Sequence, residues 1–161
     1  MHNYDTRGTD ISWMKKLLFA GIFIQENKLH AIYDRYNEMS CKQWLLMAVC
    51  GAFDRPPDLS TLAKAMGCSR QNVKKLALHL EQEGYIVLEK SPADGRALWV
   101  RKTEKGEAFS KKNQELGTKV HDAIFQEFAP EEIEEYYRLS VKMMHGLEHL
   151  ENFFKESRGK V

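Results

Sequence analysis

The polar stretch whose residue types most clearly suit the recognition of a ligand is Ser69-Arg70-Gln71-Asn72-Val73-Lys74-Lys75. Arg suits guanine edges, Asn and Gln suit adenine, and Lys suits guanine or phosphate. A serine at a helix start, with free backbone N–H groups behind it, suits a phosphate. If the apolar residues of this segment face a core, the polar ones face outward and are candidate DNA-binding residues: Ser69, Arg70, Gln71, Asn72, Lys74 and Lys75. The alternative is an ordinary solvated helix surface.

A second candidate group lies in the turn-rich link Ser91-Pro92-Ala93-Asp94-Gly95 and in Arg96, which follows it. An arginine at the tip of a projecting hairpin can enter a narrow minor groove. Asp94 is placed to hold that arginine by a charge-assisted hydrogen bond. The alternative is a surface ion pair that contributes little. Lys90 and Lys64 are further candidates for contacts to the DNA backbone.

The distribution of charge favours the same central region. The 161 residues hold 24 basic and 23 acidic side chains, which excludes a uniformly basic coat. Residues 54–112 nevertheless carry a net charge of +4, and residues 113–161 carry −4. Phosphate binding requires such local polarity, although an excess of this size also occurs by chance.

Two other kinds of site, a metal site and a reactive thiol, have weaker support in the sequence. His145-Gly146-Leu147-Glu148-His149 fits the H-x-x-E-H pattern of inverted zinc proteases, but no convincing third ligand follows. An enzyme is therefore disfavoured and no cofactor is expected, while a regulatory metal site at His145 and His149 stays open.

The three cysteines, Cys41, Cys50 and Cys68, form no CxxC pair and indicate reduced cytosolic thiols. A sensor thiol needs access and a lowered pKa. Cys41, at a helix start, has the more suitable electrostatics, Cys68 lies in a turn, and Cys50 belongs to a core. Inert thiols and a thiol-responsive protein both remain open.

The elements that would position these residues follow from apolar spacing and capping signals. Asp10, Ser40, Asp58, Ser69 and Thr103 are expected to cap helices. Gly67 and Gly84 are expected to end two of them. The expected helices are residues 10–38, a helix opening at Ser40, 59–66, 69–84, 104–128 and one from Pro130 onward. Period-two patterns predict strands at 85–89 and 97–101.

Helix, tight turn, helix and hairpin form the layout of a winged helix-turn-helix. We therefore expect a mainly α fold, with a winged helix-turn-helix DNA-binding unit at residues 40–102 and a two-stranded wing hairpin. Dimerisation helices at 10–38 and 104–156 flank it, because their broad apolar faces need a symmetry mate. No membrane span or secretory signal is found, so a cytoplasmic protein is expected.

These segments resemble the multiple-antibiotic-resistance regulator (MarR) family of bacterial transcription factors. The similar stretches are Met39 to Leu46, Leu59 to Ala63 with Ser69, Val73, Leu76, Leu80 and Gly84-Tyr85-Ile86, and Asp94-Gly95-Arg96 with Thr103-Glu104-Lys105-Gly106. Three departures stand out: Cys41 where the family often has Pro, Val87 and Leu88 at strand positions that are often charged, and Lys102 where an apolar residue is usual.

The resemblance implies a homodimer on a pseudo-palindromic DNA operator, and a repressor relieved by a small-molecule effector. The pocket candidates it implies on the first two helices are Trp13, His30, Tyr33, Trp44 and Met47, for which packed core is the alternative. A protein-interaction module, using the wing residue Trp99, is the rival from another class. A thiol- or metal-responsive regulator of the same fold is a further alternative.

Overall fold

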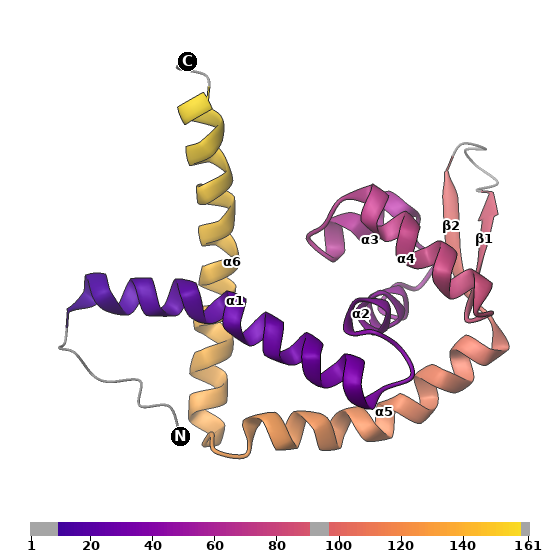
Figure 1. The fold of residues 1–161 in the computed structure, drawn as a ribbon, viewed down its shortest axis with the longest axis horizontal. Helices are drawn as coiled ribbons and strands as arrows, with labels where there is room; N and C mark the ends of the chain where they lie inside the picture. The colour runs from indigo at the N-terminus through magenta and orange to yellow at the C-terminus, as the bar shows by residue number, and fades with distance from the viewer. Residues whose placement is uncertain (1–9, 91–96, 159–161) are drawn as a thin grey trace. The chain divides into compact units, whose positions relative to one another are not determined.

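The computed structural model describes residues 10–90 and 97–158, and the chain divides into two compact units at Lys111/Lys112. Eight elements follow one another (Figure 1): α1 (Ile11–Tyr36), α2 (Cys41–Cys50), α3 (Leu59–Ala65), α4 (Arg70–Gln82), β1 (Ile86–Lys90), β2 (Leu98–Lys102), α5 (Glu104–Phe125) and α6 (Pro130–Arg158). The expected fold, mainly helical with a two-stranded antiparallel hairpin, is confirmed.

The helices begin at the residues that the capping signals predict. The Ser40 hydroxyl accepts a hydrogen bond from the Gln43 backbone at 3.3 Å, and the Gln43 side chain accepts one from the Ser40 backbone at 2.9 Å. Asp58 and Ser69 each accept from the third residue of their helices, at 2.7 and 3.2 Å. Each cap satisfies a backbone donor that the first helical turn leaves without a partner.

Two glycines set the directions in which the chain leaves α3 and α4. Gly67 has a φ of 61° and Gly84 a φ of 77°, conformations that side chains other than glycine rarely adopt. Gly67 lies in the turn that separates α3 from α4, so it fixes the angle of the helix-turn-helix. Gly84 lies between α4 and the wing, so it fixes where the hairpin starts.

The wing strands lie one residue later than the sequence pattern predicted. The antiparallel register pairs Ile86 with Lys102 and Leu88 with Val100. Tyr85, expected to open the first strand, has other partners: its N–H donates to the Leu80 carbonyl at 2.9 Å, and its carbonyl accepts from the Thr103 backbone at 3.0 Å. Tyr85 therefore closes the end of α4 and is not part of the ladder.

The first unit holds the hydrophobic core, which we call the winged core. It joins α2, α3, α4 and both wing strands through these buried residues: Met39, Leu46, Met47, Cys50, Leu59, Leu62, Ala63, Val73, Ala77, Leu80, Tyr85, Ile86 and Val100. Leu88 packs against this core, which explains an apolar residue at its strand position. Lys102 buries its stem and places its ammonium 4.0 Å from a Glu107 carboxylate oxygen.

The helices α1 and α6, which we call the flanking helices, bury none of their described residues. Their exposed large side chains include Leu18, Phe19 and Phe23 in α1 and Tyr137, Met144 and Phe153 in α6. Within the described residues, no helix combines the length and apolar character that crossing a membrane requires.

α5 ends at Phe125, three residues before the expected position. The Phe128 N–H donates to the Phe125 carbonyl at 2.9 Å, and the two rings meet edge to face. This closes a turn ahead of Pro130, which opens α6.

Candidate nucleic-acid interface

α4 presents the candidate DNA-binding side chains on its outer surface. Val73, Ala77 and Leu80 are buried and Leu76 is partly buried, so the predicted inner face of this helix is confirmed. The polar candidates are all exposed: Ser69, Arg70, Gln71, Asn72, Lys74 and Lys75. The helix is therefore anchored along one side and free to meet a ligand along the other.

The polar residues of α4 divide between two sides of the helix. With 3.6 residues per turn, Gln71 and Lys75 lie roughly opposite Val73. Lys74 and Asn72 lie about 100° to either side of Val73. Of these residues, Asn72 and Lys75 border a pocket described below, whereas Gln71 and Lys74 do not.

The start of α4 lies close to the start of α3. Backbone N–H groups of Thr61 and Ser60 hydrogen-bond to the Asp58 carboxylate, and together with the nearby Arg70 charge they lower the pKa of Asp58, the Thr61 bond contributing most. Asp58 is thus ionised at neutral pH. Arg70 is the first residue of α4, where the free backbone N–H groups also favour an anion.

The wing is described only in part. Lys90 ends β1 and is exposed, and Lys64 is exposed on α3. Asp94 and Arg96 lie outside the described residues, so their expected roles stay predictions. One wing ion pair was missed: Arg101 Nε donates to Glu89 at 3.3 Å, and this bond lowers the pKa of Glu89. The Arg101 charge is therefore already matched within the hairpin.

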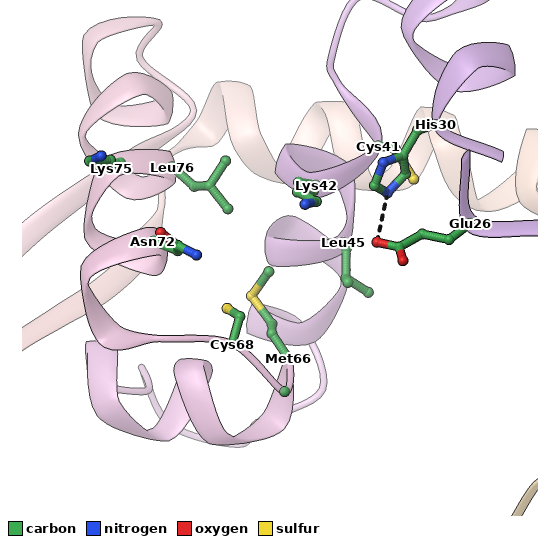
Figure 2. Close-up of a pocket in the computed structure, with 11 residues that line it drawn as sticks. Glu26, His30, Cys41, Lys42, Leu45, Met66, Cys68, Asn72, Lys75 and Leu76 are labelled. Atoms are coloured by element: carbon green, nitrogen blue, oxygen red, sulfur yellow. Dashed lines mark ion pairs between the residues drawn. The ribbon is translucent and has the colours of Figure 1, made fainter. Parts of the chain in front are cut away.

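A pocket of about 530 Å³ opens beside α4 (Figure 2). Three segments contribute its lining: α1 (Glu26, His30), α2 (Cys41, Lys42, Leu45) and the turn with α4 (Met66, Gly67, Cys68, Asn72, Lys75, Leu76). Figure 2 shows Asn72 and Leu76 pointing from α4 toward α2. Sequence spacing offered no signal for this pocket, because its lining comes from three segments that only the fold brings together.

The five residues predicted for an effector pocket do not come together in this one. His30 lines it, with Nε2 3.9 Å from the Glu26 carboxylate. Met47 is a member of the winged core. The rings of Tyr33 and Trp44 pack at 5.4 Å, and burial raises the pKa of Tyr33. Trp13 lies exposed near the start of α1.

The electrostatic prediction for Cys41 is wrong. Cys41 is buried, and burial together with the Asp34 carboxylate raises the pKa of its thiol. The same carboxylate accepts the Cys41 backbone N–H at 3.1 Å, so a group that binds the first residue of α2 also disfavours a thiolate. Cys50 is buried in the winged core, as expected, and Cys68 is partly exposed at the pocket.

The two histidines considered as metal ligands, His145 and His149, lie exposed in α6. Across residues 10–90 and 97–158, no three His, Cys, Asp or Glu side chains gather as a metal site would require.

Comparison with known proteins supports the architecture. Residues 39–97 match the model of the MarR family. A MarR/EmrR family transcriptional regulator from Acinetobacter sp. ADP1 superposes with a TM-score of 0.75 at 17% identity, over 84% of this chain and 98% of that one.

Two further structures have the same fold. FabT of Streptococcus pneumoniae, solved in complex with DNA, gives a TM-score of 0.65 at 20% identity, over 88% of this chain and 99% of that one. PcaV of Streptomyces coelicolor, solved with its natural ligand, gives a TM-score of 0.66 at 16% identity, over 90% of this chain and 98% of that one. Residues 39–97, which hold most of the winged helix-turn-helix, are therefore similar to the MarR family, and the solved structures share the fold of this chain.

Proposed function

We propose that the protein is a sequence-specific DNA-binding transcriptional regulator that reads its operator with α4. One observation carries this proposal: the polar residues of α4 and its cap are exposed, in a winged helix similar to that of the MarR family. We call these residues the exposed polar row of α4: Ser69, Arg70, Gln71, Asn72, Lys74 and Lys75. The turn at Gly67 sets the direction of α4. In this proposal Arg70, Gln71 and Lys74 contact base edges, and the start of α4 at Ser69 receives a phosphate. Lys90, Asp94 and Arg96 would supply the wing contacts.

The working form is a cytoplasmic homodimer on a pseudo-palindromic operator. The exposed apolar faces of the flanking helices support this, because a second copy would remove them from water. We propose a repressor that a small molecule releases. The PcaV structure with a ligand and the FabT structure with DNA illustrate both kinds of complex on this fold.

The test is fluorescence anisotropy with a labelled duplex from upstream of the protein's own gene, against a shuffled competitor. We expect the labelled duplex to resist the shuffled competitor and affinity to fall steeply with salt. Arg70→Ala should cost about 1–3 kcal/mol of binding free energy and relax discrimination between bases. Lys142→Ala, which removes an exposed lysine of α6, is the matched control and should change neither.

Equal competition by both duplexes, with unchanged discrimination in Arg70→Ala, would contradict the proposal. Binding that is insensitive to salt would instead favour a protein partner for the winged helix.

A further inference from the structure

Another pocket, which we call the loop pocket, lies where the end of α2, the loop between α2 and α3, β2 and the start of α5 meet. Its volume is about 220 Å³, and it shares no lining residue with the pocket beside α4. All of its lining residues belong to the first compact unit of the chain. The loop pocket is therefore a separate site within one body of the structure.

The Lys102 ammonium is the most enclosed charge of the loop pocket. Only 10% of the Lys102 side chain is exposed. A Cβ built on Gly51 would lie 2.7 Å from Lys102 Nζ, so the ammonium lies against the end of α2. Its ion-pair partner, Glu107, is 4.0 Å away, which is too far for a hydrogen bond.

This ammonium lacks an acceptor within the structure. None of the hydrogen bonds found between described residues involves Lys102 Nζ, and Glu107 contributes only charge at 4.0 Å. An ammonium that is largely removed from water and makes no hydrogen bond is destabilising. Lys102 therefore favours an anionic group inside the loop pocket.

The other charges of the loop pocket are of both signs. Arg55 and Asp54 are exposed neighbours in the loop, and Glu107 adds a second carboxylate from α5. Arg101 also borders the pocket, but its guanidinium is paired with Glu89. Together with the enclosed ammonium, the pocket thus offers two cations and two carboxylates. A ligand with charge of one sign only would meet repulsion as well as attraction.

The uncharged part of the wall is small and mostly apolar, with Cys50, Phe53, Pro56 and Val100 among its side chains. A volume of about 220 Å³ is below the range of roughly 300–1,000 Å³ that holds drug-sized ligands. The loop pocket therefore suits a molecule of few atoms that carries a short apolar group beside its charges.

We propose that the loop pocket binds a small zwitterion, a free α-amino acid with an apolar side chain. Its carboxylate accepts hydrogen bonds from Lys102 and Arg55, which gives the enclosed ammonium its acceptor. Its ammonium group donates to Asp54 and Glu107. An anion of the same size would leave these two carboxylates unmatched, and a cation would leave Lys102 unmatched. The site is separate from α4, so this inference goes beyond the proposed function and its test needs no DNA.

The first experiment compares three probes of the same carbon skeleton. L-Leucine carries both charges, 4-methylpentanoate lacks the ammonium, and 3-methylbutylamine lacks the carboxylate. An NMR titration of the isotope-labelled full chain measures the Kd of each probe. We expect L-leucine to bind about tenfold more tightly than either analogue, because each analogue loses one set of charge-assisted hydrogen bonds. An analogue that binds as tightly as L-leucine, or no binding of L-leucine at about 10 mM, would overturn the proposal.

The second experiment assigns the two ends of the ligand to their partners. Arg55→Gln should weaken L-leucine and 4-methylpentanoate about fivefold without weakening 3-methylbutylamine. Asp54→Asn should weaken L-leucine and 3-methylbutylamine without weakening 4-methylpentanoate. Lys102→Met should act as Arg55→Gln does, with a larger effect, because Lys102 is the more enclosed cation. Lys142→Gln, which removes an exposed lysine of α6, is the control and should alter none of the three.

Arg55 and Asp54 lie in an exposed loop, so their variants keep the test decisive even if Lys102→Met fails to fold. L-Leucine affinity that is unchanged in both Arg55→Gln and Asp54→Asn would contradict the proposed site. Effects of these two variants that follow the opposite ends of the ligand would contradict the proposed orientation.

Discussion

The winged core buries its large apolar side chains, whereas the flanking helices leave side chains of the same kind exposed. Leu46, Leu62 and Leu80 are 0% exposed in the winged core. Leu18 in α1 is 63% exposed and Phe153 in α6 is 61% exposed. The winged core is thus completed by its own chain, whereas the apolar side chains of the flanking helices are exposed in this structure.

This difference teaches that an amphipathic pattern specifies a helix without specifying its partner. α1 and α6 form helices as α4 does, yet neither flanking helix buries a described residue. Removing apolar area from water contributes roughly 25 cal/mol per Å² of favourable free energy, whether the covering atoms belong to the same chain or to another molecule. The stability of the two regions should therefore respond differently to matched substitutions.

The largest expected contrast is between two leucines truncated to alanine. Leu62→Ala leaves a cavity in the winged core and should lower the free energy of unfolding by about 2–5 kcal/mol. Leu147→Ala removes a half-exposed side chain of α6, so its effect should appear as weaker association of the proposed dimer. Urea unfolding and sedimentation equilibrium measure the two effects. Equal losses of unfolding free energy, with unchanged association, would remove the contrast.

A smaller contrast is expected between two helical glycines of α5. A Cβ added at Gly106 would lie 2.1 Å from the Tyr85 carbonyl oxygen, and backbone must move to admit it. Gly106→Ala should therefore destabilise the protein by about 1–3 kcal/mol. Gly117 has nothing within 4 Å of the added atom, so Gly117→Ala should stabilise by about 0.5–1 kcal/mol. Thermal melts of both variants at one concentration check the signs, and a shared sign would contradict this account.

The smallest expected effect concerns the cap of α3 and is specific to pH. The lowered pKa of Asp58 means that its carboxylate stabilises the fold above the unfolded pKa of about 3.9. That contribution is lost as the pH falls through the lower folded pKa. Asp58→Ala should cost about 1 kcal/mol at pH 7 and less at pH 3, whereas Asp58→Asn should keep the cap and lose this pH dependence. Urea unfolding at both pH values measures it. A pH-independent cost for Asp58→Ala would contradict the assignment.

Most of the fold was predictable because its signals are local. Capping at Ser40, Asp58 and Ser69 and helix ends at Gly67 and Gly84 involve neighbouring residues in the chain. The one-residue error in the wing arose because Tyr85 hydrogen-bonds to Thr103, eighteen residues away. Such a contact leaves no periodicity in the sequence.

Part of the candidate site was predictable from the sequence, and part of it was not. The exposed row of α4 followed from its helical period, but the pocket joins Glu26 to Leu76 across three segments. The prediction for Cys41 was wrong because its helix start favours a thiolate, whereas burial and Asp34 oppose one. Helix position is visible in a sequence, and desolvation is not.

The Thr103 hydroxyl donates to the Gly84 carbonyl at 2.7 Å and accepts the Gly106 N–H at 3.1 Å. One side chain thereby links the turn that follows α4 to the first turn of α5. α5 runs without a break from Glu104 to Phe125. Removal of the Thr103 hydroxyl would therefore disturb the exit from α4 and the start of α5 together, because the same oxygen serves both.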